Sequence, residues 1–376
     1  MAGAACGGGN RVKKECMTNK TDKTNEARAA FLNAAGWGDA RAEPLAGDAS
    51  TRRYERLQQN GTPAVLMIAP PGAETAACPP DADVNTRRGL GYNAMARLAG
   101  PNLNAFVALS RALRETGLSA PQVYASDPRS GFALLEDLGD DLFARVVGRV
   151  EEAALYRAAI DALASLHGRD LSPPSGTDYA MLDYDALAFE AETALLTEWY
   201  WPLKHGGGIP DDLQAEYLGI WRTLFEQLLP PHTFVLRDYH AENLLWLPDR
   251  KGAARVGIID FQDALFGNAA YDLVSLLEDA RRDVSLDLAT AMIEYYAELA
   301  GTNFDRAGFE RDYAILAAQR NAKILGIFAR LAKRDGKPRY LDLLPRVETH
   351  YRRDLARDAL APLAVFFAKH FPELAS

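Results

Sequence analysis

Two motifs carry the strongest signal for the fold of this chain: Leu236-Arg237-Asp238-Tyr239-His240-Ala241-Glu242-Asn243 and Ile258-Ile259-Asp260-Phe261-Gln262. An acidic residue is followed five positions later by an asparagine, and a second acidic residue ends an apolar run. A carboxylate can accept the proton of an attacking hydroxyl, and carboxylate and amide oxygens are the ligands that Mg²⁺ prefers. One loop therefore presents a base and a metal ligand, while a hairpin is expected to return the second carboxylate to the same pocket.

The surroundings of these residues favour phosphoryl transfer over a chance pattern, although an Asp five residues before an Asn is common by itself. Phe234-Val235-Leu236 predicts a strand before the loop, and the apolar run Leu244-Leu245-Trp246-Leu247 follows it. A turn over 248–252 leads into a second buried strand, 255–259, which ends at the second acid. This context is typical of a kinase catalytic loop and metal site. It predicts Asp238 as the catalytic base and Asn243 and Asp260 as metal ligands.

The chain changes its pattern near residue 137. Before this point we expect a helix over 24–35, five short strands and a helix over 104–116, and after it apolar residues recur at helical spacing. The pattern predicts an α+β, bilobal protein-kinase-like fold, with a small antiparallel sheet in an N-terminal nucleotide-binding lobe (26–137) and a larger helical C-terminal lobe (138–376). The expected helices of the second lobe are 150–167, 183–201, 211–229, 270–282, 286–300, 305–333 and 353–369.

Composition excludes some classes of protein. A net charge of −9 argues against a nucleic-acid partner, which usually meets a basic surface. No stretch approaches 18 uninterrupted apolar residues, and no apolar segment follows the early positive charges, so neither a membrane span nor a secretory signal is expected. We expect a cytoplasmic enzyme of undecided oligomeric state. Residues 1–25 hold almost nothing apolar to bury and are expected to be disordered.

The chain resembles the aminoglycoside phosphotransferase family of the protein-kinase-like fold over roughly residues 26 to 370. Besides the catalytic loop, the resemblance rests on 47–54, 66–71, 134–139, 260–265, 271–277 and 325–331. Within the family it points to bacterial kinases of the anomeric hydroxyl of N-acetylmuramate and N-acetylglucosamine, which serve cell-wall (peptidoglycan) recycling. The resemblance implies ATP and Mg²⁺ as cofactors and a small sugar as the substrate.

The resemblance also implies where ATP binds. A short hairpin at 47–51 stands where other kinases have a glycine-rich loop, and its backbone amides with the Ser50 and Thr51 hydroxyls are expected at phosphate oxygens. A plain β-turn is the alternative. Glu136, Asp137 and Leu138 match the segment whose backbone pairs with adenine.

One departure from the family pattern is plain, because no Lys occurs between residues 24 and 203, where most kinases place a phosphate-binding Lys on the third strand. Arg52 and Arg53 are the nearest cations that could replace it. Alternatively, Mg²⁺ and backbone donors suffice, or the protein is a catalytically silent nucleotide-binding module.

The acceptor site is less defined by the sequence. Aromatic rings stack on sugars and carboxylates accept hydrogen bonds from sugar hydroxyls, so Glu190, Trp199 and Tyr200 are candidates for its wall, with core or surface roles as the alternative. His240 and Gln262 are candidates because they lie beside the predicted base and metal ligand. Arg320 and Lys323 share a helix face and either meet an anionic acceptor or face solvent. An aminoglycoside or a choline-like amino alcohol is the alternative acceptor.

Overall fold

The structure, a computed structural model, describes residues 24–45, 52–69, 77–169, 179–230 and 233–375. Contacts divide it into two compact units, Met1–Glu74 with Gln122–Asp137 and Thr75–Pro121 with Leu138–Ser376. Residues 75–121, which the sequence pattern assigned to the N-terminal lobe, belong to the second unit by contacts. The two lobes as functional domains stay a prediction.

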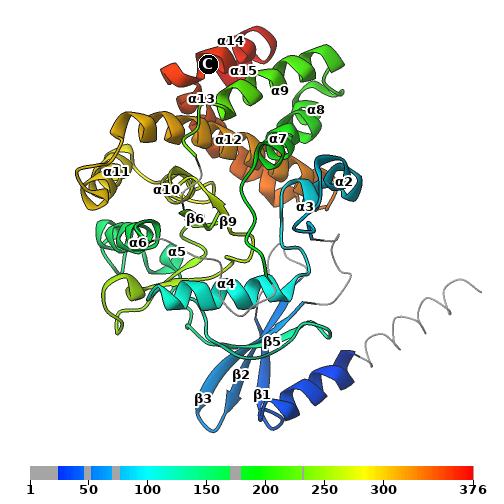
Figure 1. Cartoon of the computed structure of the whole chain (residues 1–376), viewed down its shortest axis with the longest axis vertical. Coiled ribbons are helices and arrows are strands. Elements are labelled where there is room, and N and C mark those ends of the chain that lie inside the picture. The colour runs from blue at the N-terminus through cyan, green and yellow to red at the C-terminus, as the bar shows by residue number, and fades with distance from the viewer. Residues whose placement is uncertain (1–23, 46–51, 70–76, 170–178, 231–232, 376) are drawn as a thin grey trace, which may run out of the picture. The chain divides into compact units, whose positions relative to one another are not determined.

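The first unit is a five-stranded antiparallel sheet in its described residues, with the order β1-β2-β3-β5-β4 (Figure 1). Side chains alternate along β3, so Ala64, Leu66 and Ile68 share one face with Phe132 and Leu134 of β5. A helix over 24–34 packs on this face through Leu32. The strands are β1 (Arg41–Leu45), β2 (Arg53–Gln59), β3 (Thr62–Ile68), β4 (Val123–Asp127) and β5 (Phe132–Glu136).

Five short strands followed by helices were predicted from the sequence, and this fold class is confirmed. The predicted disorder of 1–25 lies outside the described residues up to residue 23, but it is wrong for residues 24 and 25, which are helical. The expected disorder and the helix expected over 24–35 overlapped at these two residues, and the structure gives the helix.

The second unit is mainly helical (Figure 1). Its helices are α2 (Val84–Leu90), α3 (Tyr92–Met95), α4 (Leu103–Glu115), α5 (Phe143–Val146), α6 (Glu152–His167), α7 (Ala186–Leu195), α8 (Trp201–His205), α9 (Asp211–Phe225), α10 (Ala270–Leu277), α11 (Leu286–Ala300), α12 (Arg306–Lys333), α13 (Leu344–Leu355), α14 (Ala361–His370) and α15 (Pro372–Ala375). A π-helical turn, η1 (Leu196–Tyr200), joins α7 to α8.

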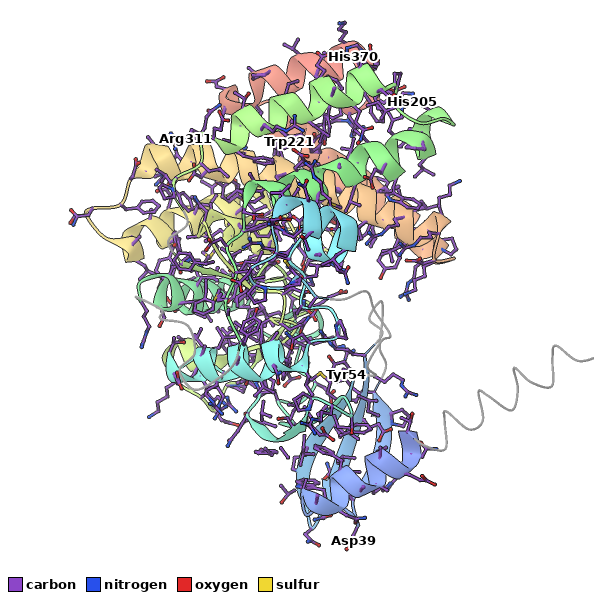
Figure 2. All side chains as sticks on the ribbon, turned by 45° about the vertical axis from the view of Figure 1, so that its right-hand side comes forward. Asp39, Tyr54, His205, Trp221, Arg311 and His370 are labelled. Atoms are coloured by element: carbon purple, nitrogen blue, oxygen red, sulfur yellow. The ribbon has the colours of Figure 1, made fainter. Side chains whose placement is uncertain are left out.

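Helix α12 is the centre of the second unit, since it packs against α7, η1, α10 and α13 (Figure 1). Gly326 allows the close approach to α7, because a Cβ there would overlap the backbone of Leu195. At one end of the unit α9 and α14 run side by side, with Trp221 and His370 on them (Figure 2). Trp221 is fully buried.

Several predicted helices are wrong in their bounds, since those over 211–229 and 270–282 end at Phe225 and Leu277. The sequence pattern gave a single helix over 353–369, whereas the structure ends α13 at Leu355 and begins α14 at Ala361. Pro362 lies in the first turn of α14, where its fixed φ suits a helix start and not a helix interior. The proline was the sequence signal for this break.

Two short antiparallel pairs of strands complete the second unit. β6 (Thr233–Val235) pairs antiparallel with β9 (Leu265–Gly267), and β7 (Leu244–Trp246) pairs antiparallel with β8 (Val256–Ile258). Both pairs flank the segment that carries the predicted catalytic residues. Among the helices of the described ranges, none combines the length and the apolar character that crossing a membrane requires.

Candidate active site

The loop that carries Asp238 begins where β6 ends, and Asp272 of α10 holds its backbone. The Asp272 carboxylate accepts hydrogen bonds from the backbone N–H groups of Leu236 (2.7 Å) and Arg237 (2.9 Å). Arg237 has a positive φ of 70°, a conformation that costs energy for a residue with a side chain. The completely buried Asp272 therefore holds the backbone of the loop in a strained form immediately before the predicted base.

The β7–β8 hairpin brings the two predicted metal ligands together. Asn243 directly precedes β7, and its carbonyl accepts a hydrogen bond of 3.1 Å from the N–H of Ile259, the residue before Asp260. Asp260 is exposed and has a positive φ of 59°. The predicted return of the second carboxylate by a hairpin is confirmed, because Leu244 pairs with Ile258 in register. A carboxylate and an amide thus lie on adjacent ends of two paired strands.

Gln262 is placed against Asp260. Its side-chain amide donates a hydrogen bond of 2.8 Å to Oδ1 of Asp260, and only 4% of the residue is exposed. The structure therefore gives Gln262 a contact that orients the carboxylate. Its Oε1 is buried and has no hydrogen-bond partner in the described part of the chain.

The charges around Asp238 keep its carboxylate ionised. Burial by itself would raise the pKa of Asp238, but the nearby positive charges, with Lys323 first and Arg320 and Arg237 after it, hold the pKa below its usual value. Lys323 and Arg320 both come from α12, which lies far from the loop along the sequence. A carboxylate that stays deprotonated is able to accept a proton from a hydroxyl at neutral pH.

A buried charge network adjoins the base, and its centre is Glu192, a residue that was not predicted from the sequence. This residue of α7 is fully buried, and its carboxylate forms an ion pair of 3.1 Å with Lys323 and another with Arg237. Gln319 donates a further hydrogen bond of 2.8 Å, and the Tyr184 hydroxyl donates another. Two cations of the Asp238 environment are therefore anchored by one carboxylate.

A sequence signal for Glu192 existed, but it was weak. Ala188, Ala191 and Leu195 form the buried face of α7, so an acid between them is surrounded by apolar positions. Glu190, which the sequence analysis chose instead, is two positions away and only half-buried. The two residues have the same chemistry, and they differ only in the side of α7 on which they lie.

His240 lies inside the loop and is 4% exposed. Its Nε2 lies 3.3 Å from the side-chain amide of Asn243 and 3.4 Å from Arg281, both of which are donors. An Nε2 that accepts from donors carries no proton. Burial also lowers the pKa of His240 to about 4, so the ring is neutral at pH 7 and braces Asn243 from within the loop.

The residues predicted to contact ATP are placed unevenly. Ser50 and Thr51 lie outside the described residues. Arg52 is buried, whereas Arg53 is exposed at the start of β2. Glu136 ends β5 and accepts a hydrogen bond of 3.0 Å from the N–H of Gln122.

Asp137 is held by a cation that the sequence analysis did not select. Arg56 of β2 donates two hydrogen bonds to the Asp137 carboxylate, of 2.7 and 3.1 Å, across the sheet of the first unit. Leu138 begins the next stretch of the second unit, where its side chain packs over Gly257 of β8. A two-pronged pair between Arg and a carboxylate is rigid, so Arg56 fixes the side chain at the end of the predicted adenine-binding segment.

The predicted acceptor residues of α7 and η1 occupy different surroundings. Glu190 is bound by two arginines, Arg222 of α9 at 2.7 Å and Arg88 of α2 at 3.4 Å. Trp199 is half-buried on η1. Tyr200 is 1% exposed, with its ring stacked on Phe371 and its hydroxyl donating to Glu348 at 2.6 Å. Tyr200 therefore packs in the interior, whereas Glu190 and Trp199 stay partly exposed.

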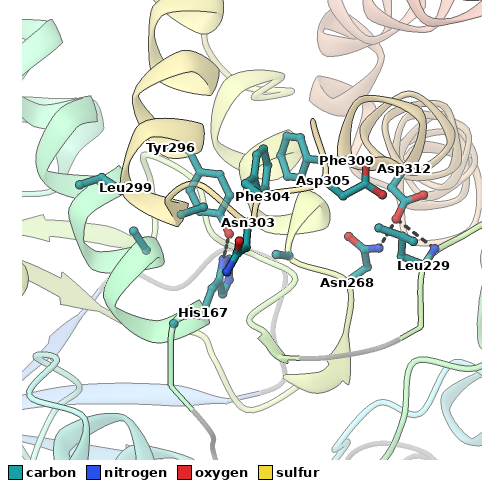
Figure 3. A pocket seen from close by; sticks show the side chains of 14 residues that line it. His167, Leu229, Asn268, Tyr296, Leu299, Asn303, Phe304, Asp305, Phe309 and Asp312 are labelled. Carbon is teal, nitrogen blue, oxygen red and sulfur yellow. Dashed lines mark hydrogen bonds between the residues drawn. The ribbon is translucent and has the colours of Figure 1, made fainter. Parts of the chain in front are cut away.

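A separate cavity of about 360 Å³ lies between α6, α11 and the start of α12 (Figure 3). Aromatic rings of Tyr296, Phe304 and Phe309 line it on one side, and Asn268 and Asp312 line it on another (Figure 3). None of the residues predicted from the sequence lines it. His167 lies between this cavity and Asp272, since its Nδ1 is 2.9 Å from the Tyr296 hydroxyl and its Nε2 is 3.9 Å from the Asp272 carboxylate.

The chain is similar to known proteins over most of its length. Residues 41–311 match the phosphotransferase enzyme family (APH). The chain is 46% identical to the N-acetylmuramate/N-acetylglucosamine kinase of Caulobacter vibrioides over 92% of its own length and 96% of that protein. It is 31% identical to the protein of the same name from Pseudomonas aeruginosa, over 86% of this chain and 87% of that one.

Solved structures share the fold at lower identity. A putative aminoglycoside phosphotransferase from Ralstonia eutropha superposes with a TM-score of 0.57 at 17% identity, covering 88% of this chain and 98% of that one. A choline/ethanolamine kinase family protein from Mesorhizobium loti gives a TM-score of 0.56 at 16% identity, covering 91% and 98%. At such identities the likeness establishes the fold alone.

Proposed function

Because the chain belongs to the phosphotransferase enzyme family, we propose that it is an ATP-dependent kinase that transfers the γ-phosphate of ATP to the anomeric hydroxyl of N-acetylmuramate or N-acetylglucosamine. The product is a sugar 1-phosphate, which suits the recycling of cell-wall sugars. The observation that carries the proposal is the 46% identity to a kinase of these sugars over 92% of the chain. The geometry of the candidate active site supports it independently.

Asp238 is the proposed general base. Lys323 and Arg320 favour its ionised form, and the strained backbone held by Asp272 fixes its position. An anomeric hydroxyl is more acidic than the other hydroxyls of a sugar, so a carboxylate base is well matched to it. Asp238 accepts the hydroxyl proton as the sugar oxygen attacks phosphorus, and the bond from phosphorus to the bridging oxygen of ADP breaks.

The residues present fit a magnesium ion. Asp260 offers an exposed carboxylate and Asn243 an amide, both oxygen ligands, and Mg²⁺ in phosphotransferases typically takes one or two protein ligands beside the substrate phosphates. No cluster of three or more acidic, His or Cys residues that would form an all-protein cage occurs in the described ranges. When bound, the ion would neutralise phosphate charge. Gln262 orients the Asp260 carboxylate toward that task.

ATP is proposed to bind at residues of the N-terminal lobe (26–137), with the acceptor bound by the C-terminal lobe (138–376). Ser50, Thr51, Arg52 and Arg53 are the proposed phosphate contacts, and Glu136 to Leu138 the adenine contacts. Trp199 and Glu190 remain proposed contacts of the sugar. Since the reaction consumes ATP, we place the protein in the cytoplasm.

The electrostatics favour an amino sugar without a positive charge over a cationic acceptor. A choline-like or aminoglycoside acceptor would bring its cation next to Asp238, where the charges of Lys323 and Arg320 already act. Like charges in a partly buried site repel each other. The same two cations suit an anionic acceptor.

The proposal is tested by measuring ADP release from MgATP with N-acetylmuramate, N-acetylglucosamine, choline and an aminoglycoside as acceptors. We expect turnover of the two sugars, and a ³¹P spectrum in which the product phosphorus couples to the anomeric proton. A phosphate on C6, or brisk turnover of choline or the aminoglycoside without turnover of either sugar, would contradict the proposal.

A further inference from the structure

Arg320 is a buried cation on the helix that also supplies Lys323. It lies in the middle of α12 and is 3% exposed. Its Nη1 is buried and has no hydrogen-bond partner in the described part of the chain. Burying a charged donor without a partner is costly, and such groups usually await an ion or a ligand. The sequence left open whether this residue faces solvent, and its burial decides against that alternative.

Lys323, the neighbour of Arg320 on the same helix face, already has partners within the protein. Lys323 follows three residues later, and its ammonium contacts Glu192 and the Tyr271 hydroxyl, each at 3.1 Å. Lys323 is therefore fixed by the protein, whereas Arg320 keeps a free donor. The Glu192 carboxylate that holds Lys323 also pairs with Arg237, the residue directly before Asp238, so this face of α12 adjoins the loop of the proposed base.

We propose that Arg320, supported by Lys323, forms an anion subsite that binds the carboxylate of the acceptor and sets the preference for N-acetylmuramate over N-acetylglucosamine. This inference rests on the proposed function. The two sugars differ by the lactyl ether of N-acetylmuramate, which ends in a carboxylate. The planar fork of an arginine matches a carboxylate with two parallel hydrogen bonds.

The position of the lactyl group agrees with this subsite. It is attached two ring carbons from the anomeric carbon, so a sugar that presents its anomeric hydroxyl to Asp238 also carries its carboxylate close to that residue. Two carboxylates in such proximity repel each other unless a cation lies between or beside them. Arg320 supplies that cation and relieves the repulsion for the acidic sugar alone.

The test compares the two sugars in one variant. In Arg320→Gln the charge and the fork are lost, and a shorter polar side chain takes their place. Losing this charge near Asp238 lowers the rate with both sugars alike, so the ratio of the two kcat/KM values is the readout. We expect the kcat/KM of N-acetylmuramate relative to that of N-acetylglucosamine to fall about 10- to 100-fold, the usual effect of losing a charge-assisted hydrogen bond. Lys333→Gln removes an exposed cation from the same helix and should change neither value.

An equal loss for both sugars would overturn the inference, because the anion would then be the transferred phosphate, which both reactions share. Arg320→Lys, which keeps the charge without the fork, should retain an intermediate preference for the acidic sugar. If the wild-type protein phosphorylates neither sugar, the proposed function itself fails, and that result is distinct from equal losses in an active enzyme.

A second measurement needs no variant and decides the matter if Arg320→Gln does not fold. The methyl ester of N-acetylmuramate keeps the lactyl group but lacks its charge. We expect the wild-type enzyme to use the acid at least about tenfold more efficiently than the ester, since one charged hydrogen bond is lost. Equal efficiency for acid and ester would overturn the subsite.

Discussion

The side-chain amide of Asn243 donates a hydrogen bond of 3.0 Å to the main-chain oxygen of Asp238. This bond closes the loop into one short turn, and the proposed base and the proposed metal ligand both lie on that turn. The carbonyl of Asn243 in turn accepts from Ile259, which precedes Asp260. A single residue thus connects the loop of the base to the strand that ends at the second carboxylate.

Replacing Asp238 by Asn should lower kcat by roughly 10²- to 10⁴-fold, because the amide cannot accept the proton of the acceptor hydroxyl. The fold and the affinity for MgATP should change little, since the loop is held through its backbone and not through this side chain. Steady-state ADP release and calorimetric titration measure the two effects. Glu242→Gln, an exposed carboxylate of the same loop, is the matched control and should stay near the wild-type rate. A D238N enzyme with more than about half of the wild-type turnover would exclude this role.

Replacing Asp260 by Ala should abolish magnesium-dependent ATP binding, because its carboxylate is the charged ligand of the proposed ion. Asn243→Ala should weaken binding less, since it removes a neutral ligand, but it also breaks the hydrogen bond to Asp238 and should lower kcat further. Calorimetric titration of ATP with and without Mg²⁺ separates these effects. Asp249→Ala, in the exposed turn between β7 and β8, is the control. MgATP binding to D260A at wild-type affinity would place the ion elsewhere.

The loop and its hairpin could be predicted because their information is local. Asp238 and Asn243 are five residues apart, and the turn that leads back to Asp260 is written in consecutive residues. The pairing of Leu244 with Ile258 follows from that turn and from the two apolar runs. The same reasoning gave the antiparallel sheet of the first unit.

The surroundings of the base could not be predicted in the same way. Glu192 and Lys323 meet only because Gly326 lets α12 lie directly against the end of α7, a contact between segments more than a hundred residues apart. Glu192 and Glu190 look alike in the sequence, and burial alone distinguishes them. Asp272 of α10 supports the loop of the base through its carboxylate, a contact between residues 36 positions apart that no local pattern predicts.

The neutral state of His240 should make stability depend on pH. Burial lowers its pKa from 6.5 to about 4. Between pH 4 and pH 6.5 the histidine therefore binds a proton in the unfolded chain but not in the folded protein. Stability is therefore lost as pH falls from 6.5 to 4, by at most about 3 kcal/mol from this group. In His240→Gln, whose amide oxygen can still accept from Asn243, urea unfolding should show a flatter pH dependence over this window. His350→Gln is a needed comparison, since burial lowers the pKa of His350 as well. Identical pH slopes for wild type and H240Q would contradict the assignment.

Two helical glycines should respond to the same substitution with opposite signs. A Cβ at Gly326 of α12 would overlap the backbone of Leu195, which cannot move aside without shifting α7, whereas a Cβ at Gly219 of α9 would meet nothing within 4 Å. Gly326→Ala should therefore cost roughly 1–3 kcal/mol of unfolding free energy from overpacking. Gly219→Ala should add roughly 0.5–1 kcal/mol, because alanine favours the helix and restricts the unfolded chain.

Urea unfolding followed by circular dichroism measures both changes, and kinase assays add a second readout. Because α7 carries Glu192, a shift of this helix in G326A should also loosen the ion pairs with Lys323 and Arg237 and so lower kcat beyond the loss of folded protein. G219A leaves these contacts untouched and should keep the wild-type kcat. If G326A were as stable and as active as the wild type, the contact between α12 and the end of α7 would be looser than the structure has it, and the anchoring of the cations beside Asp238 would need another explanation.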